Sequence, residues 1–184
     1  MNESPLIGAY WSAREETRRQ CAARAVTYLR SIASQPGLGQ WFLKGRSRLK
    51  AMLPLEVTIE GLERHLKSNN RDDDGTPIHD LGFTLGIWNG AETKSVSLAI
   101  TCGASSKFIK NFVVLNLPPE APPVDPASFE IFRMLLEKAV FAWDPDDAVA
   151  TSKEFLIRSG GGMPWVAGGW ATYHRGQGIE LHHG

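Results

Sequence analysis

The sequence predicts a single α+β domain over residues 1–184, with helices packed against an antiparallel sheet that is built around a central hairpin. Apolar and polar residues alternate strictly along residues 81–88 and again along 95–102, which is the pattern of half-buried strands. Asn89-Gly90 opens the polar connection between them, as is typical of a hairpin turn. A two-stranded hairpin is only marginally stable in water, so we expect other elements to cover its apolar face.

The N-terminal segment is expected to supply a strand and a long helix. Residues 6–11 are short, apolar and aromatic, which indicates a strand entering the sheet beside the hairpin. Ser12 and Glu15 have the spacing of a capping box, so the helix is predicted to follow Ser12 and to run to about Ser34, before Pro36-Gly37. Its apolar stripe, at helical spacing, consists of Cys21, Ala25, Tyr28, Leu29 and Ile32.

The same helix carries arginines that lie largely off its apolar stripe, at positions 14, 18, 19, 24 and 30. One interpretation is a basic binding face. The other, which we favour, is an ordinary solvated surface partly neutralised by Glu15 and Glu16.

Two further elements are expected in the middle of the chain. Thr58 can cap a second helix that extends to about Ser68. Residues 108–117 are apolar on both faces of a strand, through Phe112, Val113, Val114 and Leu115. Such a run predicts a central strand that is covered on both faces.

The C-terminal third is less regular. Asp125 and Pro126 are expected to start a helix that ends at Asp144-Pro145. Residues 155–157 are predicted to form a short strand and residues 169–173 the last strand. The buried face of the helix is expected to contain Phe129, Phe132, Leu136, Val140 and Trp143.

Composition places the chain among ordinary globular proteins, with 42% hydrophobic residues and a formal net charge of zero. Cys21 and Cys102 are interpreted as small buried hydrophobes in a reducing compartment, although a single disulfide between them stays open. No apolar run follows a basic start and no stretch approaches the length of a membrane span, so we expect a cytoplasmic protein without a membrane contact.

Two acidic clusters are candidate partner-binding sites. Asp72, Asp73 and Asp74 lie in a polar loop, and Asp144, Asp146 and Asp147 follow a helix end. Trp165, in a Gly-rich segment, is a candidate apolar anchor beside them. The clusters either meet a basic partner surface or only keep the protein soluble, and the sequence leaves both interpretations open.

Motifs that would indicate catalysis or a cofactor are absent from the sequence. It contains no HExxH pair, no Cys-x-x-Cys pair and no Gly-x-Ser-x-Gly elbow, and no Gly-Lys-Ser/Thr follows Gly160-Gly161-Gly162. We therefore expect no catalytic residue, no metal, no organic cofactor and no enzymatic activity. No nucleic-acid motif accompanies the basic residues between 44 and 50, so direct binding of nucleic acid is not expected either.

Several spaced aromatic segments resemble the immunity protein 52 family of bacteria. At the N-terminus these are Gly8-Ala9-Tyr10-Trp11, Cys21-Ala22-Ala23-Arg24, and Trp41 with Lys44-Gly45-Arg46-Ser47-Arg48; downstream they are Trp143-Asp144-Pro145 and Gly169-Trp170-Ala171-Thr172-Tyr173. The resemblance spans most of the chain. It rests on aromatic residues and glycines and includes no reactive motif.

The resemblance implies an immunity protein that binds and neutralises a cognate secreted toxin of a polymorphic toxin system. In such systems the toxin is often a nuclease of restriction-endonuclease fold delivered by type VI secretion. The acidic clusters would then present carboxylates where the nuclease binds phosphates, in an interface of about 1,600 Å² or more. Alternatives are an effector chaperone or adaptor without inhibitory activity, and a hydrolase that uses His79 or His174. The sequence does not predict the oligomeric state.

Overall fold

The structure, a computed structural model, describes residues 3–44, 52–68, 79–119, 126–158 and 169–182. The described strands are β1 (Pro5–Trp11), β2 (Phe42–Leu43), β3 (Lys67–Ser68), β4 (Phe83–Trp88), β5 (Ser97–Cys102), β6 (Asn111–Asn116), β7 (Asp147–Ser152), β8 (Ala171–His174) and β9 (Gly178–Leu181). The described helices are α1 (Arg18–Ile32), α2 (Ile59–His65), α3 (Pro126–Trp143) and α4 (Lys153–Arg158), with a 3-10 turn at His79–Leu81.

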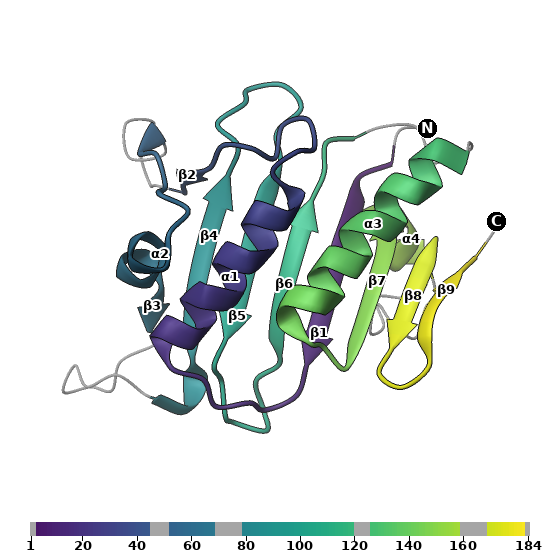
Figure 1. The fold of residues 1–184 in the computed structure, drawn as a ribbon. Coiled ribbons are helices and arrows are strands. Elements are labelled where there is room, and N and C mark those ends of the chain that lie inside the picture. The colour runs from purple at the N-terminus through teal and green to yellow at the C-terminus, as the bar shows by residue number, and fades with distance from the viewer. Residues whose placement is uncertain (1–2, 45–51, 69–78, 120–125, 159–168, 183–184) are drawn as a thin grey trace.

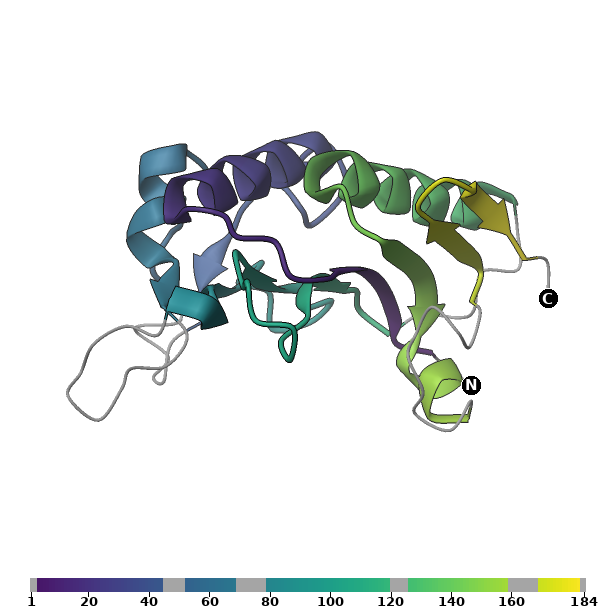
Figure 2. The ribbon, with the colours of Figure 1, turned by 90° about the horizontal axis from the view of Figure 1, so that it is seen from below.

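All the described strands belong to one antiparallel sheet, in the order β2-β4-β5-β6-β1-β7-β8-β9, with β3 also paired to β4. Helices α1 and α3 lie side by side along one face of this sheet (Figure 1). Seen from below, the two helices form an upper layer, whereas α4 lies on the opposite side of the sheet (Figure 2). The predicted α+β class is therefore confirmed.

The predicted hairpin is confirmed as the antiparallel pair β4–β5, in which Leu85 lies opposite Ile100 and Ile87 opposite Leu98. Asn89 closes the connection between the strands, because its side-chain oxygen accepts hydrogen bonds from the backbone N–H groups of Ala91 and Val96.

The sequence predicts that the first strand lies beside the hairpin, and this prediction is wrong. β1 pairs with β6 on one side and β7 on the other, and β6 separates it from β5. The reason is connectivity: β5 and β6 are joined by a short loop and form a second hairpin, which occupies the position next to β5. β1 therefore joins two groups of strands that are distant in sequence.

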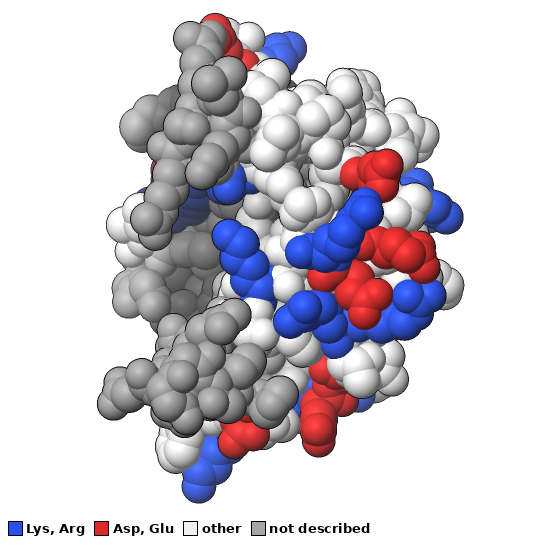
Figure 3. Space-filling view, turned by 90° about the vertical axis from the view of Figure 1, so that its left-hand side faces the viewer, with Lys and Arg blue, Asp and Glu red and all other residues white. Residues whose placement is uncertain are grey.

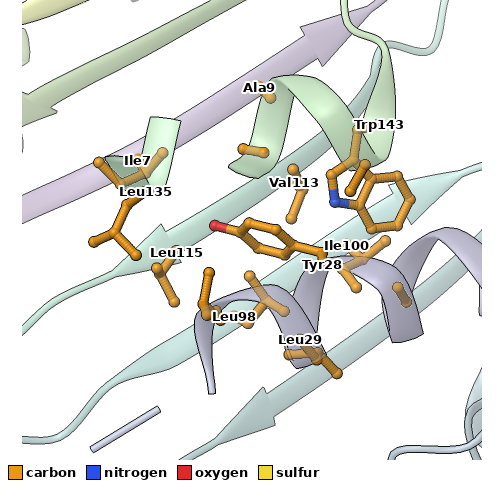
Figure 4. Packing of buried hydrophobic residues seen from close by; sticks show 14 of the residues in the cluster. Ile7, Ala9, Tyr28, Leu29, Leu98, Ile100, Val113, Leu115, Leu135 and Trp143 are labelled. Atoms are coloured by element: carbon orange, nitrogen blue, oxygen red, sulfur yellow. The ribbon is translucent and has the colours of Figure 1, made fainter. Parts of the chain in front are cut away.

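The core lies between the helix layer and the sheet (Figure 4). Tyr28 and Leu29 of α1 and Trp143 of α3 are at most 1% exposed, and they pack over sheet residues such as Leu98 and Val113. Burying side chains of this size contributes roughly 1.5–3 kcal/mol each. The predicted buried positions of α3 are confirmed for Phe132, Leu136 and Trp143, whereas Phe129 and Val140 are half-buried.

β6 differs from the strand covered on both faces that its apolar run predicts. Val113 and Leu115 are buried beneath the helices, but Phe112 and Val114 point to the other face and are half-buried. The strand is central in the sheet, as predicted. Its coverage is unequal because α1 and α3 both lie on one face.

The first helix starts later than its Ser12 capping box predicts. Thr17 is the N-cap: its hydroxyl accepts from the N–H of Gln20, whose side chain in turn accepts from the N–H of Thr17. Ser12 instead donates its N–H to Asp146, since residues 12–17 cross from the sheet to the helix layer. The predicted Thr58 cap is confirmed, although its helix ends at His65, before β3 pairs with β4.

The C-terminal third shows the largest departures from prediction. Residues 155–157 belong to helix α4, not to a strand, and β7 and β9 were not predicted. The predicted strand at 169–173 corresponds to β8, which is followed by β9 at the sheet edge. Cys21 and Cys102 are buried free thiols. No described helix combines the length and apolar character needed to cross a membrane.

Candidate functional site

The structure places three of the seven predicted site residues. Asp144, Asp146 and Asp147 lie at the junction between α3 and β7. Asp72, Asp73, Asp74 and Trp165 lie outside the described residues. The candidate site is therefore built from the junction at the end of α3.

Asp144 terminates α3 in a left-handed conformation, with φ of 45°. Its N–H donates to the carbonyl of Val140 at 2.9 Å, which closes the last turn. Asp tolerates this conformation better than most residues other than glycine. The geometry leaves the last helix carbonyls pointing out of the helix, where they need donors and favour positive charge.

Two arginines from the N-terminal part of the chain supply those donors. Arg14 donates to the carbonyl oxygens of Trp143 at 2.7 Å and Asp144 at 3.0 Å. Arg24 donates to the carbonyl oxygen of Ala142 at 3.1 Å. Both side chains thereby place positive charge at the negative end of the α3 dipole.

Glu16 holds these two arginines in position. It is only 8% exposed, and its carboxylate accepts a short hydrogen bond from Nε of Arg24 and lies 3.3 Å from Nε of Arg14. A buried carboxylate is unfavourable unless it is paired, and here it has two guanidinium partners. The three side chains thus fix one another behind the helix end.

Arg175, in the turn between β8 and β9, closes the junction from the other side. Its guanidinium donates to the backbone oxygens of Asp144 and Pro145, and it lies 3.2 Å from the carboxylate of Asp144 and 3.5 Å from that of Asp146. We call Arg14, Glu16, Arg24, Asp144, Asp146 and Arg175 the helix-end cluster.

Asp146 ties the cluster to the start of the helix layer. Partial burial would raise the pKa of its carboxyl, but hydrogen bonds from Ser12 and the positive charges of Arg175 and Lys110 outweigh burial and lower that pKa. The bond from the Ser12 N–H is 2.8 Å long. Asp146 is therefore an anionic acceptor inside the fold as well as a surface charge.

The cluster rests on stacked aromatic rings. The indoles of Trp11 and Trp143 are stacked with centroids 5.4 Å apart, and the guanidinium of Arg14 lies 4.9 Å from the centroid of Trp11. Both indoles are at most 1% exposed. This packing gives the polar groups above it a rigid base.

The three aspartates therefore do not form the isolated acidic patch that their sequence neighbourhood indicates. Arg14 and Arg175 pair with Asp144, and His174 lies 2.8 Å from Asp147. The outer groups still reach solvent, since the side chain of Asp144 is 62% exposed and that of Arg175 49%. The arrangement can present a fixed carboxylate and a fixed guanidinium to a partner.

The cationic members were not predicted as site residues. Arg14 lies 130 residues from Asp144 in sequence. Arg175 lies 31 residues from it. No local motif joins either pair, because the fold alone brings them together. The Arg-rich surface of α1 is a sequence signal for Arg24 alone among the arginines of the cluster.

That Arg-rich surface is not a free basic face. Arg19 of α1 lies 3.0 Å from Glu60 and 3.3 Å from Glu63 of α2. Blue and red side chains alternate over this side of the molecule (Figure 3). The arginines of α1 instead join the helices to each other and to the helix-end cluster.

The described part of the chain offers little for catalysis. Within it, no group of three or more His, Cys, Asp or Glu residues is placed to hold a metal ion. His174 and Asp147 form a hydrogen-bonded pair at 2.8 Å. A base and its orienting carboxylate need a nucleophile to form a hydrolytic site; the partner found here for the imidazole is the carboxylate of Asp147.

A cavity of about 380 Å³ opens at the other end of the helix layer. Leu38, Val96, Ile131 and Phe132 contribute to its mainly apolar wall, and Lys94 is its charged residue. It lies near the connection between β4 and β5, at the opposite end of the sheet from the helix-end cluster (Figure 1).

The model of the immunity protein 52 family matches residues 3–180, which is nearly the whole chain. The chain belongs to the immunity protein 52 family. No curated protein matches it. Four of the five segments that carried the resemblance meet at the site: Trp11 and Trp143 form its base, Arg24 and Asp144 belong to the helix-end cluster, and Tyr173 pairs with Ala148 in the adjacent strands. The segment at Trp41 does not, since it leads into the edge strand β2.

Proposed function

We propose that this immunity protein binds its cognate toxin in a stoichiometric complex and neutralises it as an inhibitor, without catalysing a reaction. The observation that carries the proposal is the family match over residues 3–180. Within that role, we propose that the toxin is a nuclease of restriction-endonuclease fold delivered by type VI secretion. Protection would then take place in the cytoplasm, where the nucleic acid lies.

The exposed side of the helix-end cluster is the proposed contact for this toxin. A nuclease binds phosphates, so its cleft is expected to be basic, and the carboxylates of Asp144, Asp146 and Asp147 provide complementary charge. Support comes from rigidity: the cluster is anchored by Glu16 and by the stacked indoles, so little ordering is required on binding.

Co-expression with the toxin encoded by the adjacent gene tests the function. The parent should restore growth, whereas Asp144→Asn should restore it less well, because it removes one exposed charge and keeps a residue that tolerates the left-handed conformation. Glu130→Gln is the matched control, since Glu130 is a similarly exposed carboxylate, 64% exposed, in an ion pair with Arg133.

The alternatives give different results. An effector chaperone or adaptor would bind the toxin without restoring growth, and a hydrolase would turn over substrate in isolation. Equal protection by the parent and Asp144→Asn would leave the immunity function intact and remove the helix-end cluster from the interface.

A further inference from the structure

Phe108 is the most exposed of the large hydrophobic residues in the described part of the chain, at 85%. It lies in the loop of residues 103–110, which joins β5 to β6. A phenyl ring left in water forgoes roughly 1.5–3 kcal/mol of burial free energy. An exposed ring indicates a binding site only if the fold keeps it exposed. Whether the fold does so depends on the conformation of the loop that carries the ring.

The base of this loop is fixed by a fully buried asparagine. The side chain of Asn111 is 0% exposed; it accepts from the N–H of Ala104 at 2.8 Å and donates to the carbonyl oxygens of Ala104 and Ser12 at 3.0 Å each. Gly103 packs so closely that a Cβ there would lie 2.6 Å from the carbonyl oxygen of Glu16. The loop therefore has a defined conformation where it leaves the sheet.

The outer part of the loop is also held by backbone hydrogen bonds. The N–H groups of Ser105 and Ser106 both donate to the carbonyl oxygen of Asp80 at 3.1 Å. The N–H of Phe108 donates to the hydroxyl of Ser106, and that of Ile109 to its carbonyl oxygen. These bonds fix the backbone that carries the ring, so moving that backbone inward would cost several hydrogen-bond partners.

The loop adjoins the helix-end cluster. Arg14 donates its N–H to the carbonyl oxygen of Ala104 at 2.9 Å, and Nζ of Lys110 lies 3.3 Å from the hydroxyl of Ser12. Ser12 is also the residue whose N–H bonds Asp146. The loop and the end of α3 lie at the same end of the sheet (Figure 1). An exposed aromatic ring thus lies beside a rigid polar cluster, which is the arrangement of an interface anchor and its rim.

The charge of the loop indicates the chemistry of its partner. Residues 103–110 contain Lys107 and Lys110 and no acidic residue. Nζ of Lys107 lies 5.1 Å from the centroid of the Phe108 ring. Within the described residues Lys107 forms no ion pair, whereas the carboxylates of Asp144 and Asp146 have arginine partners. The loop itself therefore carries a net positive charge.

We propose that Phe108 is the apolar anchor of the toxin interface, and that it inserts into an apolar pocket of the toxin whose rim carries carboxylates that meet Lys107. This inference rests on the proposed function, because it takes the toxin as the partner. It adds a basic contact and a second aromatic residue to an interface for which the sequence predicts two acidic clusters and Trp165.

The test uses the purified adjacent-gene toxin with an inactivating substitution, and binding is measured by calorimetry and surface plasmon resonance. Phe108→Ala should raise Kd by about 30-fold or more, as is typical of an aromatic anchor. Lys107→Glu should slow association by about fivefold at low salt, and the effect should shrink as salt is raised. Both variants should melt like the parent, because both residues are exposed.

Phe141→Ala is the matched control, since Phe141 is 79% exposed but lies on α3. It should bind like the parent. The proposal is overturned if Phe108→Ala binds as tightly as the parent, or if Phe141→Ala or Ile131→Ala at the apolar cavity is the weakened variant instead. It is also overturned if the parent self-associates and Phe108→Ala abolishes this self-association without weakening toxin binding. A parent that does not bind the toxin at all contradicts the proposed function itself.

Discussion

The indole of Trp11 stacks on that of Trp143 with ring centroids 5.4 Å apart and planes inclined by 24°. This contact joins the end of the first strand to the end of the third helix. Neither indole N–H has an acceptor among the described residues, so the contact between the two rings is one of packing without a hydrogen bond from either indole. Because the helix-end cluster lies directly above it, stability and the candidate binding surface depend on the same contact.

Trp143→Ala should therefore lower the free energy of unfolding by about 3–5 kcal/mol, as large-to-small changes at buried aromatic sites do. Trp143→Phe should cost less than half as much, since a ring remains to stack and an unsatisfied N–H is removed. Urea unfolding measures both. Phe141→Ala, two positions earlier on the exposed side of α3, is the control and should change stability by less than about 0.5 kcal/mol.

The two faces of β5 should respond differently to the same charge. Leu98 is 0% exposed and faces the helices, whereas Ser97, its neighbour, points to the other face and is half-buried. Leu98→Asp buries an unpaired carboxylate and should lower the free energy of unfolding by more than about 4 kcal/mol, whereas Ser97→Asp should cost far less. Thermal melts that coincide for the two variants would show that the assignment of the faces is wrong.

The cap of α1 offers a direct comparison between two hydroxyl residues. Thr17→Ala removes the side chain that accepts from Gln20 and should cost about 1 kcal/mol. Ser12→Ala should change stability by less than about 0.5 kcal/mol, because its hydroxyl contacts Asp146 and the exposed Lys110 amino group and caps no helix. A larger loss for Ser12→Ala would place the start of the helix where the sequence pattern first indicated it.

Asp146 should contribute a pH-dependent part of the stability. The pKa of its carboxyl is lower in the folded protein than the ordinary value of 3.8, so its contribution is present above that value and is lost as pH falls through the folded pKa. Asp146→Asn keeps an acceptor for the Ser12 N–H and removes the charge. The stability difference between parent and variant should shrink as pH falls below the ordinary value of 3.8 and through the lower folded pKa. Urea unfolding at several pH values measures it, and a difference independent of pH would contradict the assignment.

The sequence predicts elements whose signals are local. The β4–β5 hairpin follows from strict alternation, and the Thr58 cap and the Pro126 start of α3 follow from single residues with a defined role. The sequence does not predict β7, because residues 147–152 are mostly small and buried and show no alternation of apolar and polar residues. At residues 155–157 the sequence predicts a strand where the structure has α4, because three apolar residues in a row fit a strand or a helix turn equally well.

The site was less predictable than the fold. The aspartates at the end of α3 are visible in the sequence, but their charge balance depends on Arg14 and Arg175, which reach them only after the sheet has formed. Ser12 illustrates the same limit: its spacing to Glu15 matches a cap, yet its N–H is used by Asp146 across the fold. Long-range partners of this kind leave no local pattern.

Titration of the adjacent-gene toxin with the purified protein tests the central claim, direct neutralisation by binding, most directly. We predict that toxin activity falls linearly with added protein and is abolished at about one equivalent, as expected of a tight complex with nanomolar or lower Kd. Undiminished toxin activity in the presence of a tenfold excess of folded protein would contradict the claim.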